Sequence, residues 1–390
     1  MGLRTGRMLP AREVPQADCE SGGFAAIAIA AWLSSMRILY GVHTQGQGGL
    51  AKASVLVPLM ESRGHEVRVV TSGALPPTCY NFTWHRHYPG LEYVVAAGRA
   101  DYGQTISRWL KESPRVLKGL WKLRGLVREF QPQLVLSDFE PLTCSPLVDP
   151  RCEVLAVSRP CTLLDPAISL PEGRDFERKM ARTAVRLFTC GADRRCGYHL
   201  EPASYRCLPP VMTDDVSRYR STEGEHILVY NVYHTFAGSA DTLIEWAARR
   251  RQEVIAYGFP QSGHRGRVGK VDFRPAQRHQ FLSDLASAKA VITTAGMCLP
   301  LEAFLLRKPL CVVPIPGQWE QVVNAYHLQE AGMAHWSDSW DYDQLLELPA
   351  PSAQHPLQKW LTTPPDSVVA RLLGEPEPTR KKQTHDRIAA

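Results

Sequence analysis

Short apolar runs alternate along the chain with longer stretches in which apolar residues recur every three or four positions. A short apolar run bounded by glycine or polar residues predicts a buried strand, and the longer period predicts a helix that buries one face. In the first half this pattern predicts strands at 38–42, 66–71, 92–95, 134–136 and 154–158. Helices are expected at 50–63 and at 102–129, the second interrupted near Pro114 because proline lacks the backbone N–H that a helix interior needs.

A proline-rich and polar stretch at 207–220 separates this series from a second one. The second series predicts strands at 227–230, 253–257, 290–293 and 310–313, and helices at 239–251, 278–287, 299–306 and 321–331. Strands that alternate with helices are typical of parallel sheets covered by helices. The expected fold is therefore α/β, with two Rossmann-like, doubly wound domains at 36–212 and 213–373 that face a central cleft. Ligands of such sheets bind at the carboxyl ends of the strands.

The two ends of the chain differ from this body. An apolar run at 24–33 has the length of a signal-peptide core, but Glu13, Asp18 and Glu20 precede it, which is wrong for such a signal. Because the first strand begins directly after Met36, we expect residues 1–35 to lie outside the fold and Met36 to be a candidate start. Residues 374–390 have no apolar period and are expected to form a disordered basic tail.

Composition narrows the class of protein further. The 390 residues carry a net charge of +6, and half of it lies in the stretch 379–390. Without a concentrated basic stripe on the body, no nucleic-acid partner is expected. The apolar run at 24–33 is also too short for a bilayer span of about 20 residues. Ten cysteines in 390 residues are too dilute for a disulfide framework, which favours reduced thiols and a cytoplasmic location.

No metal site is expected. The closest approach to one is a group whose spacings fit no zinc finger or ribbon, namely Cys190, Cys196, His199 and Cys207.

The predicted helix 102–129 is strongly basic. It carries seven lysines and arginines against Glu112 and Glu129, with Trp109 and Trp121 among them. Two interpretations stay open. A basic amphipathic helix of this kind can lie on an anionic membrane, or its charged face is simply solvated while the apolar side packs on the domain.

The first candidate ligand site is a glycine-rich turn between the first strand and its helix. It contains Gly46, Gly48 and Gly49, and His43 ends the strand before it. Glycines permit a close approach of the backbone, and a helix N-terminus offers free N–H groups to an anion. The alternative is a tight turn without a ligand.

The second candidate follows the strand at 290–293. Small or flexible residues, Thr294, Gly296 and Met297, come before a helix with Glu302 in its first turn. Such a helix N-terminus suits a diphosphate, and the Glu302 carboxylate suits the two hydroxyls of a ribose. Taken alone, Glu302 can also be explained as a complement to the helix dipole.

A row of amides lies after the next strand. Gln318, Gln321 and Asn324 recur at intervals of three residues and share roughly one helical face. Buried amides must all find hydrogen-bond partners, so such a row is more typical of a sugar site than of a core.

The stretch 295–332, AGMCLPLEAFLLRKPLCVVPIPGQWEQVVNAYHLQEAG, resembles the donor-binding region of GT-B glycosyltransferases. The resemblance is to the UDP-glucuronosyltransferase-like and lipid II-forming N-acetylglucosaminyltransferase families. It implies that the helix N-terminus at Gly296 holds the diphosphate, Glu302 the ribose, and Gln318 with Gln321 the sugar. The glycine loop and the stretch 136–141, LSDFEP, also match, so the likeness extends over about 36–336.

One departure from these families concerns the catalytic base. Their glycine loop commonly ends in a histidine that an aspartate orients, whereas this sequence has Gly49 at that position. Asp138 occupies the place of the orienting aspartate. His43, Asp138 and Glu140 are therefore the remaining candidates, with His43 and Asp138 preferred.

The resemblance implies a glycosyltransferase that moves a hexosyl or N-acetylhexosaminyl group from a nucleotide sugar to a small-molecule or lipid-linked acceptor. UDP is the expected nucleotide and dTDP the second choice, with no metal and no cofactor beyond the nucleotide sugar. Two other hypotheses stay open. A nucleotide-sugar epimerase would turn over without an acceptor, and a non-catalytic glycosyltransferase-like partner would explain the missing histidine.

Overall fold

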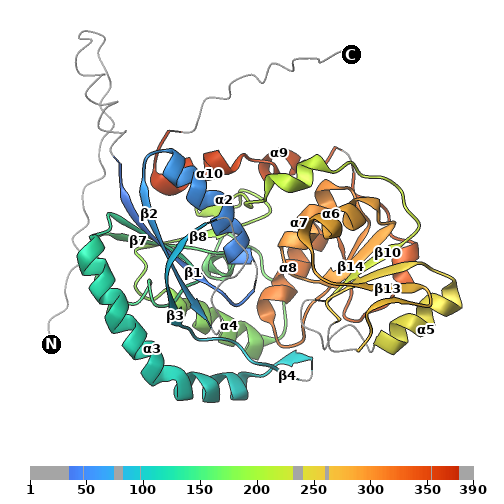
Figure 1. Ribbon diagram of the computed structural model, residues 1–390, viewed down its shortest axis with the longest axis horizontal. Helices are drawn as coiled ribbons and strands as arrows, with labels where there is room; N and C mark the ends of the chain where they lie inside the picture. The colour runs from blue at the N-terminus through green and yellow to red at the C-terminus, as the bar shows by residue number, and fades with distance from the viewer. Residues whose placement is uncertain are drawn as a thin grey trace, which may run out of the picture. The chain divides into compact units, whose positions relative to one another are not determined.

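The computed structural model describes residues 35–46, 48–73, 82–96, 98–231, 240–259, 263–352 and 354–376. The predictions for residues 1–34 and 377–390 lie outside these residues. Two seven-stranded sheets, each flanked by helices, form the two halves of the chain (Figure 1). The α/β fold class and the two doubly wound sheets are confirmed.

The first sheet has the strand order β3-β2-β1-β6-β7-β8-β9, and every neighbouring pair in it is parallel. Its strands are β1 (Arg37–His43), β2 (Glu66–Gly73), β3 (Trp84–Pro89), β6 (Leu134–Asp138), β7 (Glu153–Val157), β8 (Arg194–Tyr198) and β9 (Cys207–Leu208). Strands β1 and β6 are almost fully buried, as expected for parallel strands covered on both faces.

Four helical segments accompany this sheet: α2 (Gly48–Ser62), α3 (Tyr102–Phe130), η1 (Arg159–Leu164) and α4 (Asp175–Phe188). The prediction of an interruption near Pro114 is wrong, because α3 runs through it as one helix of 29 residues. Its buried side packs on the sheet through Val116, Leu123 and Val127, and this packing outweighs the hydrogen bond that proline removes.

Two further predictions in the first half fail at a sheet edge. The expected strand at 92–95 is only the start of a small hairpin of β4 (Val95–Ala96) and β5 (Arg99–Ala100). The actual edge strand is β3, which the apolar pattern missed because most of its side chains are exposed or half-buried.

The second sheet has the order β12-β13-β11-β10-β14-β15-β16. Its strands are β10 (Ile227–Tyr230), β11 (Val254–Tyr257), β12 (Gly266–Val268), β13 (Val271–Arg274), β14 (Ala290–Thr294), β15 (Leu310–Val313) and β16 (His335–Trp336). Its helices are α5 (Ala240–Arg250), α6 (Arg278–Ser287), α7 (Cys298–Leu305) and α8 (Trp319–Glu330). The strands and helices predicted for this half are confirmed to within two residues, while β12, β13 and β16 were not foreseen.

The chain returns to the first half at its end. After η2 (Asp214–Arg218), η4 (Gln344–Leu346) and α9 (Gln358–Leu361), helix α10 (Pro365–Leu373) lies beside α2 (Figure 1). Val368, Val369 and Leu372 pack in the core of the first sheet. The second domain predicted at 213–373 therefore ends in a helix that belongs to the first core.

The predicted tail also begins too early. Glu375 forms ion pairs with Arg63 and with His65, the latter at 3.1 Å. Residues 374–376 are thereby tied to the first half, and only the stretch from 377 lies outside the described residues.

Candidate active site

Each sheet has a central point at which consecutive crossovers turn to opposite sides. In the first sheet this point lies between β1 and β6, and in the second between β10 and β14. Ligands of doubly wound sheets bind at the carboxyl ends of the strands at such a point. Helix α2 follows β1, and α7 follows β14, so both predicted ligand motifs lie at these points.

The two motifs face each other. A β-carbon placed on Gly48, the first residue of α2, would lie 3.6 Å from the Cys298 sulfur, the first residue of α7. Gly296 has open space where a side chain would be, and Gly46 has a φ of 88°, which favours glycine. Two helix N-termini, each carrying a partial positive charge, thus converge on one space.

Unsatisfied polar side chains line the second-sheet side of this space. Thr294 ends β14, and its buried hydroxyl has no hydrogen-bond partner among the described residues. Asn231 follows β10 directly, is 2% exposed, and leaves both side-chain amide atoms equally unpartnered. Because buried polar groups normally have partners, both side chains are suited to a ligand. The sequence reasoning missed Asn231, although its place at the end of the first strand of the second half was a usable signal.

Glu302 is buried and ion-paired. Its Oε1 lies 2.7 Å from Nη2 of Arg278, and Nε of the same arginine donates to Asp215 at 2.9 Å. Burial raises the pKa of Glu302, and the Arg278 charge opposes that rise. The contact with Arg278 uses only Oε1 of the carboxylate. Met297 is half-buried beside the core of the same domain.

The three amides predicted to form a row, Gln318, Gln321 and Asn324, have different surroundings in the structure. Gln318 precedes α8 and lines a pocket. Gln321 accepts a hydrogen bond from the Ile315 N–H at 3.0 Å, so its oxygen is already used and only its amino group is left. Asn324 is wholly structural, because it accepts from Arg159 at 2.9 Å and donates to the Ala295 carbonyl at 3.0 Å.

A pocket of about 160 Å³ lies between the two halves, next to the start of α8. Five of its fifteen lining residues are aromatic, namely Tyr93, Tyr102, Phe139, Phe188 and Trp319. The hairpin of β4 and β5 is fastened to the second half beside it, since Ala100 N–H donates to the Pro316 carbonyl at 2.9 Å. The pocket thus combines apolar and aromatic side chains with a few polar ones, which is typical of small-molecule sites.

Glu320 is the carboxylate in that pocket. Burial raises its pKa, while the charges of Arg159 and Lys52 oppose the rise. The sequence analysis singled out only the amides of this stretch and did not predict Glu320. The carboxylate between Gln318 and Gln321 was the signal that could have identified it.

His43 also lines the pocket, but neither ring nitrogen is free. Nε2 donates to the Leu91 carbonyl at 2.9 Å, and Nδ1 accepts from the Gln45 N–H at 3.2 Å. Burial lowers its pKa, which keeps the ring neutral. The arrangement is that of a structural histidine, so the structure gives the predicted base no nitrogen for a substrate proton.

Asp138 ends β6 and is 4% exposed, with Lys52 of α2 beside it. The Lys52 ammonium donates to Oδ1 at 3.0 Å and lies 2.9 Å from Oδ2. Burial raises the pKa of Asp138, and Lys52 opposes this. Asp138 lies beside Gly49, since a β-carbon at Gly49 would lie 3.6 Å from Oδ2. Its lysine partner was not foreseen.

The carboxylate of Glu140, the third candidate base, is fully hydrogen-bonded within and beside the turn that follows β6. Its carboxylate accepts from the Ser72 hydroxyl at 2.6 Å and from the backbone of Leu142 and Thr143 at 3.0 and 2.7 Å. The residue is 1% exposed, so it holds the strand end in shape and does not reach a substrate.

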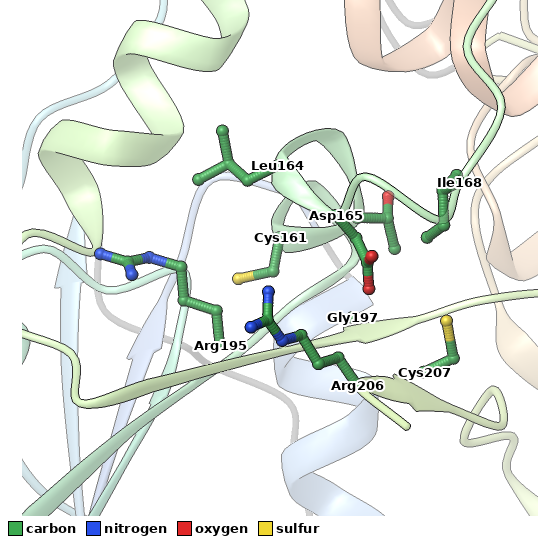
Figure 2. Close-up of a pocket in the computed structure, with 9 residues that line it drawn as sticks. Cys161, Leu164, Asp165, Ile168, Arg195, Gly197, Arg206 and Cys207 are labelled. Atoms are coloured by element: carbon green, nitrogen blue, oxygen red, sulfur yellow. The ribbon is translucent and has the colours of Figure 1, made fainter. Parts of the chain in front are cut away.

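A second, smaller pocket of about 30 Å³ lies under η1 (Figure 2). Its charged side chains are engaged elsewhere: Arg195 donates to Thr189, and Asp165 accepts from Ser204 at 2.6 Å. Figure 2 shows the side chain of Arg206 between the sulfurs of Cys161 and Cys207. Within the described ranges, no group of three or more His, Cys, Asp or Glu residues is arranged to hold a metal ion.

None of the helices in the described part of the chain is both long and apolar enough to cross a membrane.

Comparison with known proteins supports the same architecture. A structure of the glycosyltransferase SnogD from Streptomyces nogalater aligns with a TM-score of 0.53 at 17% identity, over 87% of this chain and 99% of that one. Phytolacca americana UGT2, complexed with UDP-2-fluoro-glucose and pterostilbene, aligns with a TM-score of 0.51 at 16% identity, over 87% and 89%. SsfS6 from Streptomyces sp. SF2575, complexed with thymidine diphosphate, gives 0.52 at 14% identity, over 87% and 95%.

At these identities the structures establish the GT-B fold alone. No curated protein sequence matches the chain significantly. A family model, by contrast, matches residues 36–347, which is most of the chain and includes both sheets with the space between them. The chain therefore belongs to glycosyl transferase family 1.

Proposed function

We propose that this glycosyltransferase takes its sugar from a nucleoside diphosphate sugar, with UDP as the first choice and dTDP as the second. The observation that carries the proposal is the pair of helix N-termini at Gly48 and Cys298 with unpartnered Thr294 and Asn231 beside them. This arrangement supplies N–H groups, hydroxyl and amide donors to a diphosphate. The UDP and thymidine diphosphate complexes of UGT2 and SsfS6 support the same class of donor.

The reaction we propose proceeds in one exchange of bonds. The acceptor hydroxyl attacks the anomeric carbon, the bond from that carbon to the diphosphate breaks, and the electron pair stays on the phosphate oxygen. The helix N-termini stabilise that charge, so no metal is required in this scheme. Gln318 and the amino group of Gln321 bind sugar hydroxyls, and Glu320 takes the acceptor proton, because a raised pKa improves a carboxylate as a base near neutral pH.

The acceptor site in this proposal is the pocket of about 160 Å³ with its aromatic wall. Its composition supports an apolar, ring-containing alcohol or phenol, as does pterostilbene in the UGT2 complex. Whether the transferred group is a hexose or an N-acetylhexosamine is decided by screening both donors once the nucleotide is known.

We also propose that α3 rests on an anionic membrane surface. Ile106, Leu110, Leu117 and Trp121 are 48%, 70%, 49% and 65% exposed and recur on one side of the helix. Four cations of α3 have no acidic partner among the described residues: Lys111, Lys118, Lys122 and Arg128. An exposed apolar stripe beside unpaired cations matches the interfacial helix of a peripheral membrane protein. A lipid-linked acceptor would then be reached from that surface.

The eight cysteines in the described residues are free thiols, which supports a reducing, cytoplasmic location for the enzyme.

The donor site is tested by thermal-shift titration with UDP, dTDP and GDP. A nucleotide at 100 times its dissociation constant stabilises the fold by about 2.7 kcal/mol. We expect UDP or dTDP to shift the wild type and Glu330→Gln, an exposed control on α8. Glu302→Gln, which removes the ribose carboxylate, should lose most of the shift.

Two outcomes would redirect the proposal. A wild-type protein that no nucleotide stabilises contradicts the donor site and favours a non-catalytic partner, which Gly49 at the histidine position already supports. Conversion of a nucleotide sugar without any acceptor would instead identify an epimerase.

A further inference from the structure

Lys52 is a half-buried cation on α2 with no part in the proposed reaction scheme. Its side chain is 14% exposed, and its ammonium lies 4.4 Å from the ring centre of Tyr198. The ammonium donates to Oδ1 of Asp138 at 3.0 Å and lies 2.9 Å from Oδ2, so it contacts both carboxylate oxygens. An ammonium group has three N–H donors, so at least one N–H of Lys52 is left for another acceptor beyond the two oxygens of Asp138.

Gly49 explains why Asp138 depends on this lysine. A β-carbon at that position would meet Val42 Cγ1 at 3.2 Å and Asp138 Oδ2 at 3.6 Å, but glycine places no side chain there. Asp138 therefore has no imidazole to orient, and the carboxylate anchors an ammonium instead. An ammonium group only donates hydrogen bonds, so it suits an anion and not the proton of an acceptor hydroxyl.

Lys52 also lies on the side of α2 that faces the donor motif. Gly48, four residues before it and so on the same side of the helix, lies against Cys298 at the start of α7. Cys298 is exposed, and two charges act on its thiol: Glu302 raises its pKa and Lys52 lowers it. Lys52 likewise opposes the raised pKa of Glu320. Its charge thus acts on both the donor side and the acceptor side of the cleft.

We propose that Lys52, held in place by Asp138, binds the donor diphosphate and stabilises it as it leaves. The inference rests on the proposed donor. The acceptor oxygen bonds to the anomeric carbon, the bond to the diphosphate oxygen breaks, and that oxygen keeps the electron pair and meets a Lys52 N–H. The acceptor proton goes to Glu320. Asp138 is a positioning residue, and the pair acts on the leaving group where related enzymes use a histidine on the acceptor.

The test separates phosphate recognition from nucleoside recognition. Affinities of UDP, dTDP, uridine and thymidine are measured by calorimetry for the wild type and for the double variant Lys52→Met, Asp138→Asn. The double variant removes both charges at once, so no buried carboxylate is left unpaired. We expect the nucleoside diphosphate to bind about 10- to 100-fold more weakly, which is the range for one charged hydrogen bond. The nucleoside should bind as before.

Lys52→Arg keeps the charge and should retain most of the diphosphate affinity, with a steeper loss of binding in salt than the double variant shows. Equal losses for diphosphate and nucleoside, or no loss, would overturn the role of Lys52. If diphosphate binding is abolished by Glu302→Gln and untouched in the double variant, the donor site stands and only this inference fails. If the wild type binds neither nucleotide, the proposed function fails as well.

Discussion

Burial sets the chemistry of single residues in this cleft. His43 and Glu320 line the same pocket, and both ring nitrogens of His43 are hydrogen-bonded to backbone groups. In each case burial disfavours the charged form, lowering the pKa of the histidine and raising that of the carboxylate. Burial therefore makes the histidine a weaker base and the carboxylate a stronger one, which supports the proposed role of Glu320.

This contrast predicts opposite phenotypes for two isosteric changes. Glu320→Gln should lower kcat by about 10²- to 10⁴-fold, the usual contribution of a general base. It should also remove the fall of kcat at acidic pH that protonation of Glu320 causes in the wild type. His43→Gln should cost about 1–2 kcal/mol in the free energy of unfolding through two weakened hydrogen bonds and leave the pH profile of kcat unchanged. Steady-state kinetics and urea unfolding of both variants measure this. A His43 variant whose acidic limb disappears would return the role of base to the histidine.

At the scale of elements, α3 shows how tertiary packing overrides a local signal. Proline at position 114 predicts a break, yet the helix continues because Leu123, Val127 and Phe130 are anchored in the core of the first sheet. Continuity matters for the proposed membrane contact, because it places Ile106, before Pro114, and Trp121, after it, on one exposed stripe.

Vesicle co-sedimentation tests the α3 surface. The full-length protein should bind vesicles that contain anionic phosphatidylserine, with binding that weakens as salt rises, and not neutral phosphatidylcholine vesicles. Leu110→Glu with Trp121→Glu should abolish binding without destabilising the fold, since both side chains are largely exposed. Phe176→Glu on α4, also 65% exposed, is the matched control. If the double variant still sediments with anionic vesicles, another part of the chain, such as residues 24–33, is responsible.

At the scale of the whole molecule, a buried polar network joins the two halves. Arg159 of η1 donates to His327 of α8 at 2.8 Å, and His327 donates to the Ser169 carbonyl at 2.7 Å. His199 lies against His327, with ring centres 4.8 Å apart. Burial, with the Arg159 charge second, lowers the pKa of His199 to about 3 and that of His327 to about 4.

These shifts make stability fall on acidification. A histidine in the unfolded chain has a pKa of about 6.5. Below pH 6.5 the unfolded chain therefore binds one proton at His199 and one at His327, whereas in the folded chain both histidines stay neutral. Each histidine should remove about 1.4 kcal/mol per pH unit between pH 6.5 and about 4. His327→Gln should reduce the slope of the unfolding free energy against pH by the amount that corresponds to one bound proton. His335→Gln, at an exposed position of β16, is the control and should leave the slope unchanged. Denaturant unfolding from pH 7.5 to 4.5 measures the slope, and an unchanged slope in His327→Gln would contradict the assignment.

Local pattern was sufficient for much of this protein. The apolar period located β10, α6 and β15 within a residue, because buried parallel strands and amphipathic helices leave a strong signal. The motif at Thr294, Gly296 and Glu302 was recognisable because strand, turn and helix N-terminus are consecutive in the sequence. Edge strands such as β3 and β12 leave little apolar signal, since most of their side chains are exposed or half-buried.

Contacts between segments far apart in the chain are visible only in three dimensions. The residue pattern is sufficient for the fold class, the division into two halves and the glycine at position 49. The pattern does not predict the ion pair between Lys52 and Asp138 or the packing of α10 in the core of the first sheet. It also does not predict that both ring nitrogens of His43 form hydrogen bonds with the backbone. A pairwise contact of this kind depends on the three-dimensional path of the chain, and no residue pattern along one segment encodes it.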